Sequence, residues 1–302
     1  MKKTKVTVNE LVSFLGKEVI RVYGETVENL YIDNLADVAH VSETTLDWVK
    51  PSNPNRQIVA EQSKARVVLV DEEVLPIAGK VLLVVKSPKR ALALIGNHFF
   101  VTKPTSEIYP TAIIDPKAVI GKNVYIGPYA VVGKAVIADG CFIDSNVRIY
   151  DDVVLGMNCN IKSGAVLGGA GFGFEKDENG NRFRFPQVGR LIIGDDVEVG
   201  ANTCIDRGAL SDTVIGDHSK INNLCHIAHN NQIGRNVVIA GCVNISGSCV
   251  IEDNVWISPN VSLRGFNHIG EGAVIGTGAV VTKNIPSGET WVGNPARKMV
   301  KK

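Results

Sequence analysis

Two histidines, His226 and His229, are the side chains of this sequence whose type and spacing most directly suggest chemistry. An imidazole exchanges protons near neutral pH, so His229 could remove a proton from an attacking nucleophile. Gly247 follows one 18-residue interval after His229, in the run Ile-Ser-Gly-Ser. A glycine N–H exposed at a turn could stabilise the oxyanion of a tetrahedral intermediate. The pair predicts a general base and an oxyanion donor, whereas an isolated turn histidine would be only a solvated surface residue.

A six-residue repeat identifies the elements that would position these residues. From Ile215 onward an aliphatic side chain returns at every sixth position, and earlier blocks of the same repeat begin at Ile114 and Ile193. The uninterrupted block comprises Ile215, Ile221, Ile227, Ile233, Ile239, Ile245, Ile251, Ile257, Leu263, Ile269, Ile275 and Val281. A period of six does not fit the 3.6-residue turn of an α-helix, but it contains the two-residue alternation of a strand. The repeat therefore predicts short strands joined by turns.

The side chain two positions before each aliphatic residue is usually small, and both would point inward from one short strand. Three such strands close a triangular coil of about 18 residues, and stacked coils pair through their backbones about 4.8 Å apart. This pattern predicts a mainly β fold, the hexapeptide-repeat parallel β-helix, with about eight coils. His229 would then lie directly beneath Gly247 at one corner. Four cysteines occupy the small inward position, where a thiol packs as a small apolar group: Cys141, Cys159, Cys225 and Cys249.

The limits of the repeat divide the chain into a small N-terminal α/β domain, a β-helix domain and a short tail. We expect these three parts to span residues 1–106, 107–288 and 289–302. In the first domain, Val8–Leu15 is predicted to form a helix, because Thr7 and Glu10 stand at the spacing of a capping box.

Two insertions interrupt the repeat at specific coils. The first, residues 168–190, carries Phe172 and Phe174, which we assign to substrate binding, and the second adds four residues between Ile205 and Ile215. Insertions leave a solenoid as surface loops, and loops on a rigid scaffold often carry binding residues. We therefore expect both insertions to contribute to a binding site.

Composition and charge exclude several classes of function. The 302 residues carry a net charge of +1, which gives no basis for bulk binding to nucleic acid or to an anionic membrane. No stretch approaches the roughly 18 apolar residues that span a bilayer, so we expect no integral membrane segment. The six cysteines show no CxxC spacing, which favours a reduced, cytoplasmic protein.

Four motifs occur in the order in which a known family carries them: the GFGF loop, PQVGR, IDRGAL and IAHN. With them, the sequence resembles the UDP-3-O-acylglucosamine N-acyltransferases of lipid A synthesis (LpxD) over nearly the whole chain. The resemblance implies a left-handed β-helix, a uridine-binding N-terminal domain, and a homotrimer with active sites in clefts between subunits. It also implies that His229 deprotonates the sugar amine and that Gly247 supplies the oxyanion hole. Asn223 matches an active-site asparagine of the family, and its neighbour Asn222 replaces an aspartate.

Other positions depart from the family pattern. Phe266 stands where the family has a second histidine that helps bind the pantetheine arm of the acyl carrier, and His268 lies two residues further on. The aromatic pair that sandwiches uracil aligns near Asp47 and Asn53, with Trp48 one residue out of place. We retain Trp48 and His268 as candidate substrate-binding residues, together with the two asparagines.

We infer the acyl donor from the C-terminal sequence. The segment GNPARKMV is similar to the end of acetyl-CoA-dependent hexapeptide acetyltransferases, and we expect no counterpart of the C-terminal helical extension with which the family engages acyl carrier protein. These features favour acetyl-CoA as co-substrate and a UDP- or dTDP-linked amino sugar of surface polysaccharide synthesis as acceptor. The alternative is the family's own reaction, in which a 3-hydroxyacyl carrier protein acylates UDP-3-O-acylglucosamine. Neither reaction requires a bound cofactor.

Two further classes of function are alternatives. The His-x-x-His spacing of His226 and His229 suggests zinc, and γ-carbonic anhydrases carry zinc on this scaffold. That site needs a third histidine, whereas the residue one coil beyond His226 is Asn244, so we expect no metal site. We assign His226, which would point outward near His229, to substrate binding. The other alternative is a non-catalytic β-helix, but such proteins usually carry monotonous faces such as threonine arrays, which this sequence lacks.

Overall fold

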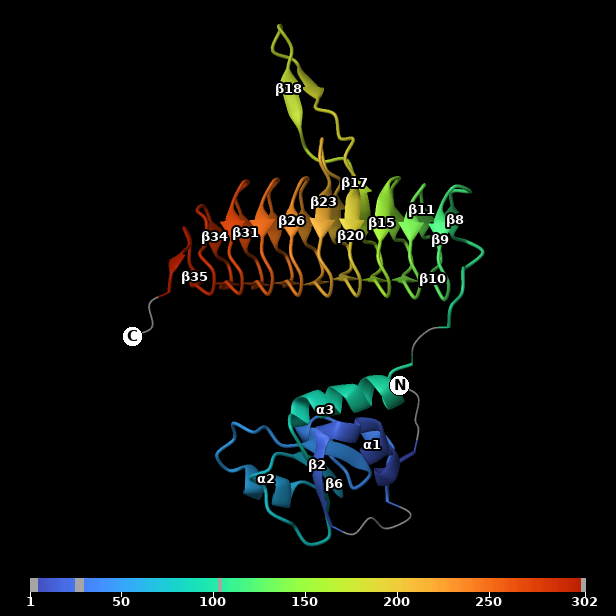
Figure 1. The fold of residues 1–302 in the computed structure, drawn as a ribbon, viewed down its shortest axis with the longest axis vertical. Helices are drawn as coiled ribbons and strands as arrows, with labels where there is room; N and C mark the ends of the chain where they lie inside the picture. The colour runs from blue at the N-terminus through green and yellow to red at the C-terminus, as the bar shows by residue number, and fades with distance from the viewer. Residues whose placement is uncertain (1–4, 25–29, 103–104, 300–302) are drawn as a thin grey trace. The chain divides into compact units, whose positions relative to one another are not determined.

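A computed structural model of the protein describes residues 5–24, 30–102 and 105–299. The chain divides into two compact units, Met1–Lys103 and Pro104–Lys302, and each has its own hydrophobic core (Figure 1). The division falls slightly before the boundary predicted at residue 106. Among the residues described, no helix is long and apolar enough to cross a membrane.

The N-terminal unit is a five-stranded sheet with the order β2-β7-β6-β5-β4, in which only β2 runs antiparallel to its neighbour. The strands are β2 (Val19–Tyr23), β4 (Asn34–Leu35), β5 (Thr45–Trp48), β6 (Val67–Val70) and β7 (Val81–Val85), and β1 (Val6–Thr7) pairs separately with β3 (Tyr31–Ile32). The helices are α1 (Val8–Leu15), α2 (Arg56–Gln62) and α3 (Pro88–Ile95), with the short turns η1 (Gly16–Glu18), η2 (Val38–His40) and η3 (Gly96–Phe100). Buried residues of α1 and α3 pack in one core cluster and Ala60 of α2 packs in another, so the helices cover both faces of the sheet.

Helix α1 begins and ends at the predicted residues. The Thr7 hydroxyl accepts a hydrogen bond from the Glu10 amide at 3.3 Å, and the Glu10 carboxylate accepts one from the Thr7 amide at 2.7 Å. This reciprocal pair satisfies two amides that a helix start otherwise leaves free, which confirms the predicted capping box.

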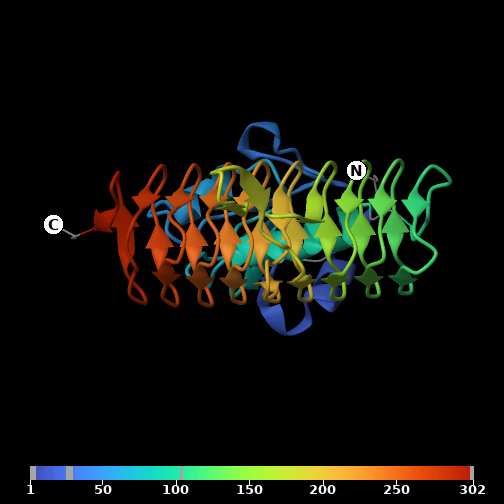
Figure 2. The ribbon, with the colours of Figure 1, turned by 90° about the horizontal axis from the view of Figure 1, so that it is seen from above.

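The second unit is a left-handed parallel β-helix built from three sheets that run along its length (Figures 1 and 2). The ten-stranded sheet contains β10 (Tyr125–Ile126), β13 (Phe142–Ile143), β16 (Asn160–Ile161), β21 (Glu198–Val199), β24 (Lys220–Ile221), β27 (Val238–Ile239), β30 (Trp256–Ile257), β33 (Val274–Ile275), β35 (Thr290–Val292) and β36 (Arg297–Lys298). The nine-stranded sheet contains β8 (Ile113–Ile114), β11 (Val131–Val132), β14 (Arg148–Ile149), β17 (Val166–Gly169), β22 (Cys204–Asp206), β25 (His226–Ile227), β28 (Asn244–Ile245), β31 (Ser262–Leu263) and β34 (Val280–Val281). The eight-stranded sheet contains β9 (Val119–Ile120), β12 (Val136–Ile137), β15 (Val153–Leu155), β20 (Leu191–Ile193), β23 (Thr213–Ile215), β26 (Gln232–Ile233), β29 (Val250–Ile251) and β32 (His268–Ile269).

Equivalent residues of successive coils stand in register, as the repeat predicts. Ile227 pairs with Ile205 in the preceding coil and with Ile245 in the next, and all three are buried. The four cysteines at the small inward position are also buried, which confirms that they belong to the core: Cys141, Cys159, Cys225 and Cys249. The rows of aliphatic side chains therefore fill the interior of the β-helix and fix the position of each corner along its axis.

The turns between the sheets rely on residues in the left-handed backbone conformation. Asparagine and glycine, which tolerate positive φ, hold many of these positions. At the corner that joins the nine-stranded to the eight-stranded sheet, the left-handed residues of three successive coils are Asn230, Ser248 and Phe266, with φ of 62°, 62° and 63°. The chain thus turns sharply directly after His229 and after Gly247.

The two insertions and the C-terminal segment complete the second unit. The first insertion forms an antiparallel hairpin, β18 (Phe174–Lys176) with β19 (Arg182–Arg184), which projects from the β-helix (Figure 1). The second insertion widens the turn between β22 and β23. In the segment that we predicted to be the C-terminal tail, β35 extends the ten-stranded sheet and β36 pairs back on it, so this segment closes the last coil. The reason is that Trp291 packs against the core of the β-helix.

Candidate active site

The corner between the nine-stranded and eight-stranded sheets brings His229 and Gly247 together. His229 lies in the turn from β25 to β26, and Gly247 occupies the equivalent turn one coil later. A methyl group added to Gly247 would lie 2.8 Å from His229 Cε1 and 3.0 Å from its Nε2. Any side chain at residue 247 would therefore collide with the imidazole. Glycine allows the backbone of one coil to lie directly against the histidine of the coil before it.

A hydrogen bond to Asn230 determines which nitrogen of His229 carries the proton. His229 Nδ1 lies 2.8 Å from Asn230 Oδ1, which also accepts a hydrogen bond from the Ala209 amide at 3.1 Å. The Asn230 amide cannot be turned around, because its Nδ2 donates to Ser211 O at 3.0 Å. Since Oδ1 is only an acceptor, Nδ1 must be the donor. The neutral ring then presents an unprotonated Nε2, the state that a general base requires.

The second insertion holds Asn230 in place. Besides Ser211 O, Asn230 Nδ2 reaches Ser211 Oγ at 2.7 Å, and the Asn230 backbone amide donates to Thr213 Oγ1 at 2.8 Å. The inserted turn therefore acts on His229 through Asn230. Sequence reasoning placed this insertion near the site but missed Asn230, although the residue stands next to the histidine in the IAHN motif.

The backbone amide of Gly247 lacks the side-chain partner that some equivalent turn amides have. At Arg235, for example, the amide donates to Asp253 Oδ1 of the next coil at 2.7 Å. The residue opposite Gly247 in the next coil is Gly265, which has no side chain to accept a hydrogen bond. Within the described parts of the chain no acceptor contacts the Gly247 amide. This N–H, on a glycine that lies against His229, is free to bind a developing oxyanion.

His226 lies on the outward side of β25, between Cys204 of β22 and Asn244 of β28 in the same sheet. Its Nε2 is 3.3 Å from Asp206 Oδ2. This hydrogen bond raises the pKa of His226 above its usual 6.5, against the opposing effect of partial burial. His226 therefore carries positive charge over a wider pH range than a free histidine.

The pair of His226 and Asp206 predicts a pH-dependent contribution to stability. A raised pKa in the folded protein means that the contribution is complete below pH 6.5 and disappears as the pH rises through the folded-state pKa. We expect His226→Gln to lower the free energy of unfolding by about 0.5 kcal/mol at pH 5.5 and by almost nothing at pH 8.5, since the nearly half-exposed imidazole is screened by solvent. Thermal unfolding of both proteins at the two pH values tests this; an equal difference at both would contradict it.

The root of the first insertion lies against His229. A methyl group on Gly171 would be 2.8 Å from His229 Cδ2 and 2.8 Å from Gln187 Oε1. Gln187 Oε1 is buried and has no hydrogen-bond partner among the described residues. Gly171 and Gln187 form a wall of the site that sequence reasoning did not identify, although both stand in the quoted GFGF and PQVGR segments.

Phe172 and Phe174 lie next to this wall. Their ring centroids are 5.0 Å apart in an edge-on arrangement, and Phe172 is 85% exposed. The Arg184 guanidinium lies 5.0 Å from the Phe174 centroid and donates to Gly171 O at 2.9 Å. An exposed aromatic surface beside a cation is suited to an apolar chain or a sugar face carrying an anionic group.

Asn222 and Asn223 lie at a different corner from His229. Their turn joins β24 of the ten-stranded sheet to β25 of the nine-stranded sheet, one strand before the histidine. Asn223 Oδ1 accepts a hydrogen bond from the Ala201 amide at 2.7 Å, and Asn222 Oδ1 accepts one from the Asn223 amide at 2.8 Å. A single chain therefore does not bring the two asparagines to His229.

His268 also lies away from the His229 corner. It is on the outward side of β32 in the eight-stranded sheet, whereas His226 belongs to the nine-stranded sheet. Its Nε2 is 2.7 Å from Glu252 Oε1. This hydrogen bond and one from the Glu271 amide, the larger cause, lower the pKa of Glu252. The structure gives His268 a hydrogen-bond partner at the surface rather than a place beside His229.

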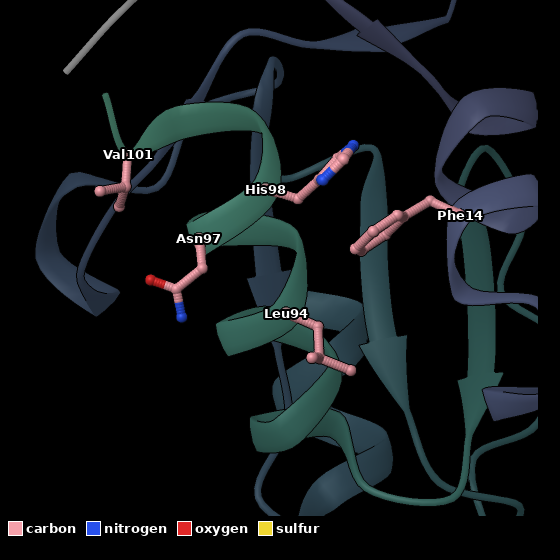
Figure 3. A pocket seen from close by; sticks show the side chains of 5 residues that line it. All are labelled: Phe14, Leu94, Asn97, His98 and Val101. Carbon is pink, nitrogen blue, oxygen red and sulfur yellow. The ribbon is translucent and has the colours of Figure 1, made fainter. Parts of the chain in front are cut away.

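Trp48 belongs to β5 of the N-terminal unit and packs half-buried against its core. Its neighbour Asp47, at a position aligned with a uracil-stacking aromatic, accepts a hydrogen bond from Ser63 Oγ at 2.5 Å. A cavity of about 510 Å³ lies elsewhere in this unit, between α1 and η3, and Trp48 does not line it (Figure 3). Phe14 and His98, which face each other there, stack with centroids 4.2 Å apart.

Within the described residues, no three His, Cys, Asp or Glu side chains gather in an arrangement that could hold a metal ion. His226, one of the two histidines whose spacing suggested zinc, is hydrogen-bonded to Asp206. The ring nitrogens of the two histidines thus have separate partners, Asp206 and Asn230.

Comparison with protein families gives two matches within the chain. Residues 95–210 match the family described as the GMPPB C-terminal domain, and residues 248–283 match the bacterial transferase hexapeptide family of six repeats. The solved structure of LpxA, a UDP-N-acetylglucosamine acyltransferase from Bacteroides fragilis, has a TM-score of 0.58 and 28% identity, over 64% of this chain and 74% of its own. LpxA from Acinetobacter baumannii has a TM-score of 0.58 and 29% identity, over 64% and 73%.

Two curated relatives match nearly the whole chain. The UDP-3-O-acylglucosamine N-acyltransferase of Coxiella burnetii is 36% identical over 294 residues, covering 89% of this chain and 84% of its own. The enzyme of the same name from Pseudomonas aeruginosa is 39% identical over 269 residues, covering 82% and 74%.

The coil architecture and its repeats place the protein in the class of hexapeptide-repeat acyltransferases. Because the identity with the two relatives extends over most of both chains, the protein belongs to the UDP-3-O-acylglucosamine N-acyltransferase family, as the sequence motifs indicate.

Proposed function

We propose that this protein N-acylates UDP-3-O-acylglucosamine, with a 3-hydroxyacyl carrier protein as donor. The observation that carries the proposal is the corner at which His229, oriented by Asn230, lies against Gly247, whose amide has no partner among the described residues. A base and an oxyanion donor side by side are what attack of an amine on a thioester needs.

The acyl donor proposed here differs from the one that the sequence interpretation favoured. Acetyl-CoA was favoured because of the C-terminal segment GNPARKMV, but part of that segment forms β36 and closes the ten-stranded sheet. The curated relatives are named for UDP-3-O-acylglucosamine and match the N-terminal unit as well as the β-helix. Both considerations favour the alternative, acylation in lipid A synthesis, over acetylation of a surface-polysaccharide sugar. This reaction would take place in the cytoplasm, where the acyl carrier protein is found.

The proposed mechanism uses the groups at the corner in sequence. As the amine nitrogen attacks the thioester carbonyl, His229 Nε2 takes a proton from the amine and the carbonyl electrons move onto oxygen. The Gly247 N–H stabilises this oxyanion, and the Asn230 carbonyl stabilises the imidazolium through Nδ1–H. Collapse of the tetrahedral intermediate breaks the C–S bond, and the imidazolium returns its proton to the departing thiolate. The products are an amide and a free carrier thiol.

The remaining substrate-binding residues come from two sources in this proposal. Phe172 and Phe174 line the corner from the same chain, through the root of the first insertion. Asn222 and Asn223 lie at another corner, so they can reach the substrate of His229 only from a neighbouring copy. We therefore propose a homotrimer with three sites between subunits, in which His226 also faces the cleft. Trp48 would contribute to nucleotide binding from the N-terminal unit.

A thiol-release assay tests the reaction. Purified protein is given UDP-3-O-acylglucosamine or other UDP- and dTDP-amino sugars, with 3-hydroxyacyl carrier protein and acetyl-CoA compared side by side. We expect turnover with the acyl carrier protein and UDP-3-O-acylglucosamine, and at least about a hundredfold lower kcat/KM with acetyl-CoA, because the short donor loses its chain-binding energy. Turnover with acetyl-CoA alone would overturn the proposed donor, and thiol release without any amino sugar would overturn the acceptor.

A further inference from the structure

Asn231, directly after the His229–Asn230 pair, is a buried polar residue in the core of the β-helix. It is 0% exposed and occupies the small inward position two residues before Ile233. Most equivalent positions hold an apolar residue, usually valine, alanine or cysteine, and the other polar residues buried there are Thr203, Thr213, Ser219 and Asn267. A buried amide is tolerated only where its hydrogen bonds are satisfied.

The hydrogen bonds of Asn231 all go to the backbone of the two catalytic turns. Its Nδ2 donates to Ala228 O at 2.7 Å, directly before His229, and to Ser246 O at 3.1 Å, directly before Gly247. Its Oδ1 accepts from the Cys249 amide at 2.9 Å, two residues after Gly247. One side chain therefore ties the turn that carries the base to the turn that carries the oxyanion donor.

At two other corners of the β-helix, a hydroxyl group makes two of the three hydrogen bonds that Asn231 makes. Ser219 Oγ donates to Gly234 O at 2.9 Å and accepts from the Val237 amide at 3.1 Å. Thr203 makes the matching pair of bonds, to Asn222 O and from the Cys225 amide. A hydroxyl has one donor and can hold one carbonyl, whereas an amide has two N–H groups. Asn231 uses its second N–H for the turn to which it belongs.

The turn that carries His229 takes its hydrogen-bond donor from a different residue than a regular turn does. In the regular geometry, the inward side chain 15 residues earlier donates to the carbonyl after the strand, as Ser219 does for Gly234. The residue at that distance before Ala228 is Thr213, whose hydroxyl instead accepts from the Asn230 amide. Asn231 supplies the hydrogen bond that the carbonyl of Ala228 receives.

We infer that Asn231 is a positioning residue that sets the separation between His229 and Gly247 from inside the β-helix. It touches neither substrate nor reacting atoms and acts through the two turns. The inference rests on the proposed function, because only acyl transfer at this corner makes the separation matter. Without Asn231 the two turns keep their sheet pairing, but the imidazole and the Gly247 amide are free to move relative to each other. Misplacement of catalytic groups by about 1 Å can lower the rate about a hundredfold. We therefore expect the loss of Asn231 to lower kcat rather than to change KM.

The test compares Asn231→Ala and Asn231→Ser with the matched variant Ser219→Ala. All three remove buried hydrogen bonds between coils, and Ser219 lies at another corner, away from His229. We expect Asn231→Ala to lower kcat about 30-fold with KM nearly unchanged, and Asn231→Ser, which keeps one donor, to lower it about fivefold. Ser219→Ala is expected to lose a comparable amount of thermal stability while keeping kcat within about twofold, measured well below the unfolding temperature of each protein.

A double variant separates positioning from general destabilisation. In the His229→Ala background, Asn231→Ala should cause no further loss of kcat, because the group that it positions is absent. Equal kcat for Asn231→Ala and Ser219→Ala would overturn the inference, and if Asn231→Ala does not fold, equal kcat for Asn231→Ser and wild type would do so. Activity of His229→Ala close to wild type would instead overturn the proposed function. The two failures are therefore distinguishable in one set of assays.

Discussion

The His229→Ala variant is expected to lose about a thousandfold in kcat, with a much smaller change in KM. In the proposed mechanism His229 Nε2 accepts the amine proton in the step that makes the C–N bond, while Nδ1 is held by Asn230. The side chain lies at a turn and is not part of the hydrophobic core, so the variant should keep its fold. Steady-state kinetics with UDP-3-O-acylglucosamine and 3-hydroxyacyl carrier protein measure the effect.

His218→Asn is the matched control for this variant. His218 also lies at a turn of the β-helix and is 3.4 Å from Asp196, and its left-handed backbone suits asparagine. We expect kcat within about twofold of wild type, as for other surface substitutions. Light scattering and circular dichroism establish that both variants are assembled and folded. Turnover of a folded His229→Ala protein within tenfold of wild type would show that another group is the base.

Replacement of Gly247 by alanine should have the second largest effect. The new methyl group would lie 2.8 Å from His229 Cε1, a distance that such atoms do not adopt, so the imidazole or the turn must move. The Gly247 N–H remains in the variant, but it no longer faces the position that the base requires. We expect kcat to fall about a hundredfold, the usual consequence of displacing a catalytic group by about 1 Å.

Gly169→Ala distinguishes this collision from the general effect of an added methyl group. Its new methyl would meet only the Tyr150 ring, at 3.8 Å, which is ordinary van der Waals contact. Gly169→Ala should therefore keep kcat within about threefold of wild type. If Gly247→Ala behaves in the same way, the glycine amide does not lie where the chemistry occurs.

The architecture of the β-helix could be predicted because the sequence period determines both the element and its neighbours. A coil of three short strands fixes the residues that stack on one another, so Ile227 pairs with Ile245 and His229 lies beneath Gly247. The capping box of α1 is equally local, since Thr7 and Glu10 interact within one helical turn. Predictions of this kind need only short-range geometry.

We retained Asn222, Asn223 and His268 as candidate site residues because of the family resemblance. The repeat geometry alone does not place them beside His229. Asn223 has the same place in its repeat as His229, but it lies one strand earlier and so at another corner of the triangle. His268 lies two coils and one strand beyond His226 and so on another sheet. The period places these residues apart in one chain, and only the packing of copies can bring the asparagines to the site.

The residues that orient the base were missed because they depend on an insertion, whose conformation has no period. Nothing in the segment containing Ser211 and Thr213 indicates that it hydrogen-bonds to Asn230. Asn231, by contrast, left a signal: a large polar residue at the inward position of a regular repeat. The C-terminal strand β35 was missed because Trp291 is an aromatic residue at a position where the repeat otherwise places an aliphatic one.

The most direct test of the central claim is mass spectrometry of the nucleotide sugar after incubation with 3-hydroxyacyl carrier protein. Wild-type protein and His229→Ala are given equal amounts of UDP-3-O-acylglucosamine, and fragmentation locates the new acyl group. The predicted result is an amide at the sugar nitrogen with wild-type protein and almost none with His229→Ala over the same time. An unmodified sugar amine with wild-type protein, or equal amide formation by both, would contradict it.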